Sequence, residues 1–278
     1  MIPPHSRASF GVIQTQRDLT MTETQRDVLS KVPAITLGFW IIKILATTLG
    51  ETGGDTVSMS MNLGYLVGTG IFLSVLAGLV WWQIAADRFR PWLYWATIVA
   101  STTAGTTLAD FATRSMGIGY TGGSALLLAA VAASLLAWRL TLGSVSSDTV
   151  STPRAEVFYW LTITLSQTLG TALGDWTADT GGLGYVGAAV VFGLALAVVA
   201  GLYFGTRVNR VVLFWAAFIL TRPLGAVVGD FLDKPLDHGG LAFSRPIASL
   251  VLTAAIVALI LILPQRAGAH PKHEKVEA

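Results

Sequence analysis

The chain has 278 residues, of which 53% are hydrophobic and only 12% charged, and it contains no cysteine. Soluble domains carry about 25% charged residues, so this composition excludes an ordinary soluble domain. The missing cysteine excludes disulfide scaffolds, Cys-ligated zinc or iron–sulfur sites and cysteine nucleophiles. The net charge is +2 and the basic residues are scattered, so we expect no nucleic-acid partner.

The predicted elements begin with a polar tail over residues 1–31, which lacks the apolar core of a signal peptide. Eight apolar segments follow, each about long enough to cross a bilayer as a helix. They cover residues 34–54, 63–85, 92–112, 118–138, 156–177, 183–204, 211–231 and 243–263. A second polar tail covers 265–278. The sequence therefore predicts an all-α integral membrane protein with an eight-helix membrane domain over 32–264.

The distribution of charge predicts the orientation of these helices. The two tails and the loops around residues 87–90, 139–156 and 207–210 hold 13 positive and 8 negative residues, whereas the other segments hold 5 and 8. Cytoplasmic loops concentrate Lys and Arg. We therefore expect both termini to lie in the cytoplasm.

A pattern of aromatic, glycine and aspartate residues occurs four times. Numbered from the Trp of each repeat, position 10 is Gly, position 15 is Asp and position 24 is Gly. The anchors are Trp40, Trp95, Trp160 and Trp215, and the aspartates are Asp55, Asp110, Asp175 and Asp230. This periodicity predicts four tandem two-helix repeats, over about 32–87, 88–142, 153–207 and 208–264.

Repeats of two helices all enter the membrane in the same direction, so they are related by an axis along the membrane normal. We therefore expect the four aspartates to lie at one depth. The glycines at position 10 are expected to allow close helix approach.

The pattern resembles a bacterial family usually called uncharacterised membrane-anchored proteins, which carry four tandem repeats of unknown function. The resemblance covers about residues 31–264 and includes the opening segment from Val32 through Phe39-Trp40 to Gly50-Glu51. It implies two membrane spans and a characteristic Trp in each repeat. It also implies a multi-pass protein of the bacterial inner membrane, and it supplies no activity.

Positions 8, 11 and 15 share one face of the first helix of each repeat, because i, i+3 and i+7 are neighbours on a helix. We expect these polar helices inside the bundle and the apolar second helices against lipid. The candidate metal ligands are Glu51, Asp55, Asp110, Asp175, Asp179 and Asp230. The candidate pathway or charge-balancing residues are Lys43, Thr48, Thr103, Thr106, Thr168, Thr171, Arg222 and Asp233.

An ionised carboxylate in the bilayer costs roughly 2.5–3.5 kcal/mol and needs a partner. Lys43 and Arg222 are expected to neutralise two acids, which leaves the remaining charge to bound cations, protons or water. Oxygen ligands favour hard ions such as Mn²⁺, Mg²⁺, Ca²⁺ or Na⁺. The pairs Glu51/Asp55 and Asp175/Asp179 are the strongest candidates, since like charges four residues apart repel unless a cation or proton is bound.

These features predict a transporter of a cation, such as divalent manganese, that is coupled to protons. Its partners are the lipid bilayer and a small cation; we expect no cofactor and no enzyme activity. Two alternatives stay open. In the first, the protein is a membrane sensor or accessory scaffold whose aspartates end a helix or cap the next turn. In the second, a carboxylate pair serves an intramembrane enzyme.

Overall fold

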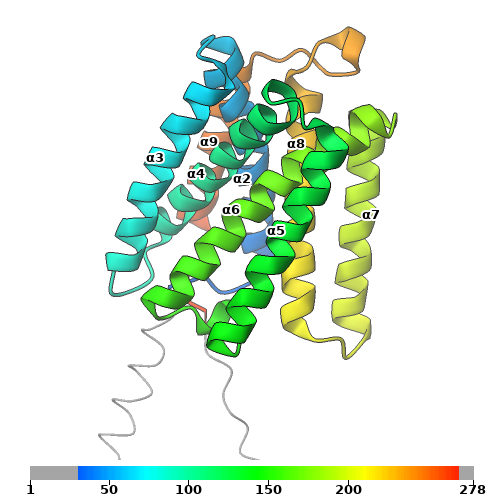
Figure 1. Ribbon diagram of the computed structural model, residues 1–278. Helices are drawn as coiled ribbons and strands as arrows, with labels where there is room; N and C mark the ends of the chain where they lie inside the picture. Colours follow the sequence, from blue (N-terminus) through cyan, green and yellow to red (C-terminus); the bar gives the residue numbers. More distant parts are fainter. Residues whose placement is uncertain (1–30, 269–278) are drawn as a thin grey trace, which may run out of the picture.

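The computed structural model describes residues 31–268, which form a bundle of eight long α-helices (Figure 1). The first helices of the repeats are α2 (Leu37–Asp55), α4 (Pro91–Asp110), α6 (Pro153–Asp175) and α8 (Arg210–Asp233). The second helices are α3 (Gly64–Ala85), α5 (Gly119–Leu142), α7 (Gly184–Gly205) and α9 (Arg245–Ile262). Except for Lys31 and residues 265–268, the predicted tails lie outside the described residues.

The four first helices form a closed inner ring, in which α2 contacts α4, α4 contacts α6, α6 contacts α8 and α8 returns to α2. Each second helix packs on the inner helix of the following repeat, so that α3 covers α4, α5 covers α6, α7 covers α8 and α9 covers α2. The outer helices expose most of their side chains. The prediction of polar helices inside and apolar helices outside is confirmed.

The glycines at position 10 set the spacing of the inner ring. In every repeat, a β-carbon on this glycine would collide with position 7 of the next repeat around the ring. At Gly105, for example, it would lie 2.9 Å from the backbone carbon of Gln167, and at Gly170 it would overlap the Arg222 side chain. The predicted role in close helix approach is therefore confirmed.

The connection from the first to the second helix of each repeat lies at the upper end of the bundle in Figure 1, opposite the end where α2 begins. A π-helical turn directly follows Asp55, Asp110 and Asp175, over Thr56–Ser60, Phe111–Ser115 and Trp176–Thr180. In the fourth repeat α8 continues to Asp233 instead. The glycine at position 24 then has a positive φ of 63° to 80° in all four repeats, a conformation that costs other residues energy.

Five of the helices, α3, α5, α7, α8 and α9, are long and apolar enough to cross a membrane. The inner helices α2, α4 and α6 do not reach that level because threonines and carboxylates interrupt their apolar residues. The apolar helices agree with a membrane protein.

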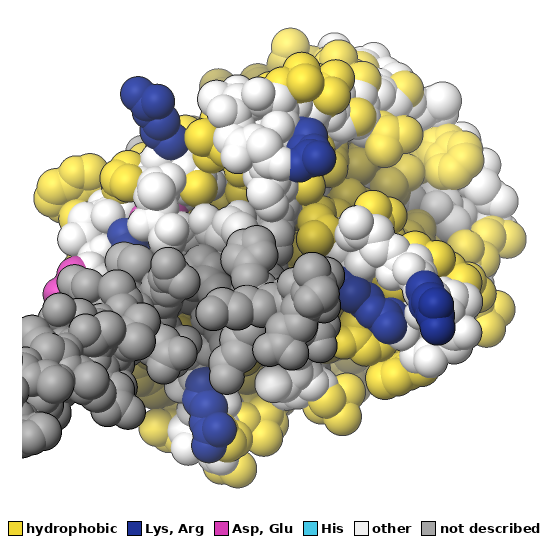
Figure 2. All heavy atoms as spheres, turned by 90° about the horizontal axis from the view of Figure 1, so that it is seen from below, with side chains coloured by type: hydrophobic (Ala, Val, Ile, Leu, Met, Phe, Trp, Pro, Cys, Tyr) yellow, Lys and Arg dark blue, Asp and Glu magenta, His cyan; other side chains and the backbone are white. Residues whose placement is uncertain are grey.

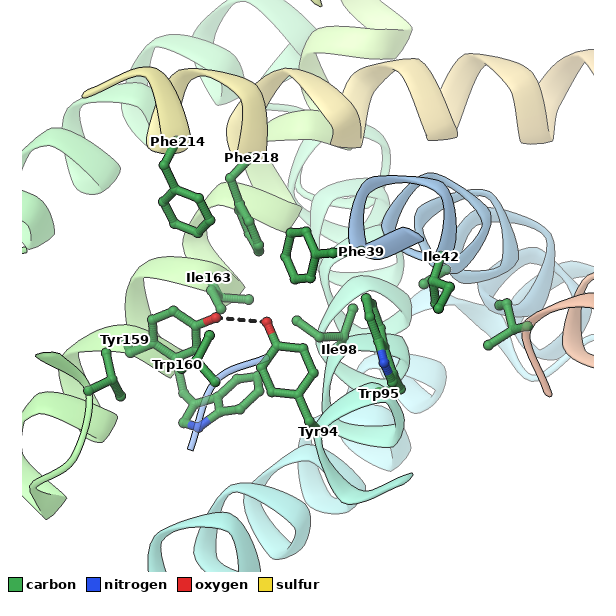
Figure 3. Close-up of a cluster of buried hydrophobic side chains, with 14 of the residues drawn as sticks. Phe39, Ile42, Tyr94, Trp95, Ile98, Tyr159, Trp160, Ile163, Phe214 and Phe218 are labelled. Atoms are coloured by element: carbon green, nitrogen blue, oxygen red, sulfur yellow. Dashed lines mark hydrogen bonds between the residues drawn. The ribbon is translucent and has the colours of Figure 1, made fainter. Parts of the chain in front are cut away.

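The lower end of the ring is filled by aromatic side chains, which Figure 3 shows in close-up. The hydroxyl groups of Tyr94 and Tyr159 lie 2.8 Å apart and form a hydrogen bond across α4 and α6. Trp95, Trp160 and Trp215 are each at most 4% exposed, so these repeat tryptophans serve helix packing.

The two ends of the described chain meet below this aromatic cluster. The backbone of Ala34 donates a hydrogen bond to Arg266, and Gly268 donates one to Val32. Beside them, Lys31 Nζ lies 2.7 Å from Glu156 Oε1 in a buried ion pair. The first and last repeats are thus joined at the lower end.

Candidate functional site

The four aspartates at position 15 gather at the upper end of the inner ring, and each is at most 3% exposed. We call Asp55, Asp110, Asp175 and Asp230 the aspartate ring. Asp55, Asp110 and Asp175 precede the π-helical turns, but their side chains make no capping hydrogen bond. Each of these three aspartates therefore ends its α-helix, as the structural alternative predicts, but none of them caps the next turn.

Three cationic side chains contact the aspartate ring. Lys234 Nζ lies 2.6 Å from Asp55 Oδ2 and 2.9 Å from Asp230 Oδ1, and Arg114 lies 3.0 Å from Asp110 and 3.3 Å from Asp175. Arg245, which begins α9, bridges Asp233 at 3.1 Å and Asp55 at 3.7 Å. These cations lie at the start of α9 or at position 19, four residues beyond a ring aspartate. Every member of the aspartate ring therefore has a positive neighbour.

Two groups of three carboxylates bring oxygen atoms within 4.8 Å of one another, and all are buried. One group is Glu51, Asp55 and Asp110, and the other is Asp55, Asp230 and Asp233. Among the described residues, Asp55 Oδ1 accepts no hydrogen bond, so it is available to a hard cation. Asp110 Oδ1 lies 3.0 Å from Arg114 and Asp230 Oδ1 lies 2.9 Å from Lys234 Nζ, so a metal ion would have to displace these two cations.

Asp175 and Asp179 belong to neither group. Asp179 is exposed, because it lies in the π-helical turn after α6 rather than on the inner face of that helix. Its pKa is raised, first by partial loss of solvent and then by the negative charge of Asp230.

Burial disfavours the charge of Lys234, but Asp230, Asp55 and Asp233 together raise its pKa well above the ordinary value.

Below the aspartate ring, the Arg222 guanidinium contacts the other three repeats. Its Nη2 lies 2.9 Å from Glu51 Oε2 on α2, and it donates to the hydroxyl groups of Thr106 on α4 and Thr171 on α6. The three partners all occupy position 11 of their repeats. Arg222 itself is fully buried, so its head group lies where the four inner helices converge. The predicted pairing of Arg222 with an acid is confirmed.

The threonines predicted at position 8 do not join this cluster. Thr48, Thr103 and Thr168 each donate their hydroxyl hydrogen to a carbonyl four residues earlier on their own helix. Thr103 lines an apolar groove between α3, α4 and α9, together with Phe72 and Ile256. The face of each inner helix that points into the ring therefore includes position 7 instead of the predicted position 8.

Lys43 is fully buried, yet its ammonium group contacts no carboxylate within residues 31–268. Its Nζ lies 3.5 Å from Thr221 Oγ1 and 4.1 Å from the centre of the Phe218 ring. The prediction that Lys43 neutralises an acid is wrong, because Glu51 lies eight residues away on the same helix, roughly 12 Å along its axis.

Position 7 was missed by the sequence reasoning, although it is polar in all four repeats: Thr47, Thr102, Gln167 and Arg222. Three of these have buried polar atoms without a hydrogen bond among the described residues: Thr102 Oγ1, both amide atoms of Gln167, and Nε and Nη1 of Arg222. The polar residue at position 7 of every repeat was the sequence signal that could have identified this position as part of the inner face. It points to a polar layer in the middle of the bundle.

The sequence matches the family described as "Repeat of Unknown Function (DUF347)" over residues 38–89, 93–144, 158–209 and 213–265. Each match begins two residues before the repeat Trp. The prediction of four tandem repeats is thereby confirmed. Neither the curated proteins nor the solved structures contain a match to this chain.

Proposed function

We propose that this chain, which belongs to the DUF347 family of repeats of unknown function, transports a small cation across a membrane. The proposal places all eight helices across the bilayer, with the pseudo-symmetry axis of the repeats along the membrane normal. The cation is a hard ion: either Na⁺ or a divalent metal ion such as Mn²⁺. Its movement is coupled to the movement of protons. We assign no catalytic reaction and no cofactor to the chain.

One observation carries this proposal. Glu51, Asp55 and Asp110 are buried, offer oxygens within 4.8 Å of one another, and include Asp55 Oδ1, which accepts no hydrogen bond among the described residues. The seven acids of the inner and upper site outnumber its five cations, which are Lys43, Arg114, Arg222, Lys234 and Arg245. A bound cation would offset the excess negative charge. A carboxylate can also take up a proton instead, which gives a chemical basis for exchange of cation against proton.

The Lys and Arg side chains that contact the aspartate ring would neutralise its carboxylates when no transported cation is bound. Lys234 and Arg114 hold the ring aspartates in the absence of a metal, and an arriving cation replaces them. The aromatic cluster around Tyr94 and Tyr159 closes the opposite end. Transport therefore requires a second arrangement, in which the aromatic end opens and the aspartate end closes.

The orientation follows from the charges near the two ends. Figure 2 shows the lower end, with Lys and Arg side chains spread around it and little acid visible. Of the described residues there, eight are Lys or Arg and three are Asp or Glu, whereas the upper end has three basic and seven acidic residues. By the positive-inside rule, this difference supports a cytoplasmic position of the lower end. The aspartate ring then faces the outside of a bacterial inner membrane.

The alternative is an accessory or scaffold protein whose carboxylates only join helices. It is favoured by one observation: each ring aspartate already has a Lys or Arg neighbour within 3.3 Å. The two functions differ in what a neutral substitution does to cation movement.

The deciding experiment measures cation flux into proteoliposomes with an ion-sensitive dye, using Mn²⁺, Mg²⁺, Ca²⁺ and Na⁺ with and without a pH gradient. The test variant is Asp55→Asn/Asp110→Asn, and the matched control is Asp87→Asn, an acid with an 82% exposed side chain at the opposite end. We expect flux of one ion in wild type and control and a loss of at least tenfold in the folded test variant. No flux of any ion through folded wild-type protein would support the scaffold function instead.

A further inference from the structure

The middle of the inner ring holds one more cationic side chain than acidic ones among the described residues. Between the aromatic cluster and the aspartate ring, the charged side chains are Lys43, Arg222 and Glu51, all at most 2% exposed. Glu51 pairs with Arg222, which leaves Lys43 without an acidic partner within residues 31–268. An uncompensated charge away from water costs several kcal/mol. A buried lysine can lose its proton instead, so a bound anion is the partner that would keep the Lys43 ammonium charged in this layer.

Hydrogen-bond donors without acceptors gather in the same layer. Among the described residues, Nε and Nη1 of Arg222 and Nε2 of Gln167 find no acceptor, and Gln167 Oε1 finds no donor, although both side chains are fully buried. Lys43 Nζ has only the Thr221 hydroxyl at 3.5 Å and the face of a phenyl ring. Buried polar groups are nearly always hydrogen-bonded. Unused N–H groups beside a positive charge are complementary to an anion.

The contacts around Arg222 bring these donors together. Thr221, which lies next to Lys43 Nζ, directly precedes Arg222 in the chain. Arg222 also donates to Thr171, one helical turn above Gln167, and its side chain fills the space at Gly170. The same residues thus bring the Lys43 ammonium, the Arg222 guanidinium and the inner face of α6 to one level of the bundle.

We propose that Lys43, Arg222 and Gln167 bind a small inorganic anion in the middle of the inner ring. The anion is small and monovalent, because a single negative charge is enough to balance Lys43. Its charge balances Lys43, and its contacts satisfy N–H groups of Arg222 and the Gln167 amide. This site is distinct from the carboxylates of the aspartate ring and does not depend on cation transport.

The first test compares thermal unfolding of the purified full-length protein in potassium chloride and in potassium gluconate at equal ionic strength. We expect chloride to raise the Tm of the wild type in a saturable manner. Lys43→Met should lose this response and should unfold at a higher temperature than wild type in gluconate. Arg154→Met removes the same charge from an exposed position and should respond as wild type does.

A second variant tests the site with the Lys43 charge retained. Gln167→Leu should raise the half-saturating chloride concentration about tenfold, since a hydrogen bond to a charged partner is lost. Crystals grown with bromide should show an anomalous peak between Lys43 and Arg222. The inference is overturned if the wild-type Tm is the same in both salts, if Lys43→Met keeps the wild-type response, or if only water occupies the layer. The cation flux assay is read separately, so either proposal can fail alone.

Discussion

Arg222 Nη2 lies 2.9 Å from Glu51 Oε2, which joins the fourth repeat to the first across the buried centre of the ring. This pair links residues 171 positions apart in the chain. It gives the ring a single charged bond at a level where the other two repeats contribute only hydroxyl groups, from Thr106 and Thr171. The first and fourth repeats therefore differ from the second and third: Glu51 replaces the threonine of position 11, and Arg222 reaches it from position 7.

Breaking this pair should destabilise the protein strongly, because the remaining charge is buried without its partner. We expect Glu51→Gln and Arg222→Met each to cost about 3–5 kcal/mol, and the double variant to cost less than the sum. Unfolding by denaturing detergent, followed by helical circular dichroism, measures all three. Strictly additive costs would show that the two side chains do not stabilise each other.

Close helix approach predicts opposite effects for two glycine substitutions. Gly225→Ala places a methyl group into Thr47 of α2 and should cost about 1–3 kcal/mol through overpacking. Gly201→Ala lies on the exposed side of α7 with no neighbouring atom within 4 Å, so better helix propensity should stabilise it by up to about 1 kcal/mol. Thermal unfolding of the two variants compares them directly, and equal effects would contradict the packing role.

Lys234 should compete with a metal ion for Asp55, Asp230 and Asp233. Lys234→Met removes the ammonium group that lies within 3.8 Å of all three. We expect the variant to bind Mn²⁺ at least about tenfold more tightly than the wild type does. In the wild type, the Lys234 ammonium repels the metal ion, and a like charge at this distance costs several kcal/mol even at an intermediate dielectric. Without metal, the variant should unfold at a lower temperature. Isothermal titration measures the affinity, Arg154→Met is the control, and unchanged or weaker binding would contradict the competition.

The raised pKa of Asp179, in the π-helical turn after α6, predicts that the stability of the protein depends on pH. Its pKa is raised in the folded protein, first by partial loss of solvent and then by Asp230, so the folded state holds this proton more tightly than the unfolded state. The stabilising contribution is therefore complete below the ordinary carboxyl pKa of about 3.9 and is lost as the pH rises through the raised value. The Tm advantage of Asp179→Asn over wild type should grow across that window. A difference that is constant with pH would contradict the raised pKa.

The repeat pattern determined much of the architecture. The common spacing of Trp, Gly and Asp fixed four equivalent two-helix units and placed Asp55, Asp110, Asp175 and Asp230 at one depth, because equal offsets along parallel helices give equal heights. The contrast between polar and apolar helices decided which would lie inside. Both conclusions follow from local sequence and helix geometry alone.

The rotation of each inner helix was decided only in the tertiary structure. Positions 7 and 8 differ by about 100° around a helix, so either could complete the stripe with positions 11 and 15. The glycine at position 10 selects position 7, because it accepts that residue of the neighbouring repeat at close range. For this reason Gln167 and Thr102 lie in the polar layer, whereas Thr103 lines the groove beside α3.

Charge pairing also needed the closed ring. The sequence identifies acids and bases but not which of them meet, since Arg222 and Glu51 are brought together by the contact of the last inner helix with the first. Lys43 is on the same helix as Glu51 but two turns lower, which leaves it beside Phe218 without an acid. Composition and periodicity thus determined the repeats and their depth, whereas ring closure decided the partners, because pairing depends on distances between helices that no local pattern encodes.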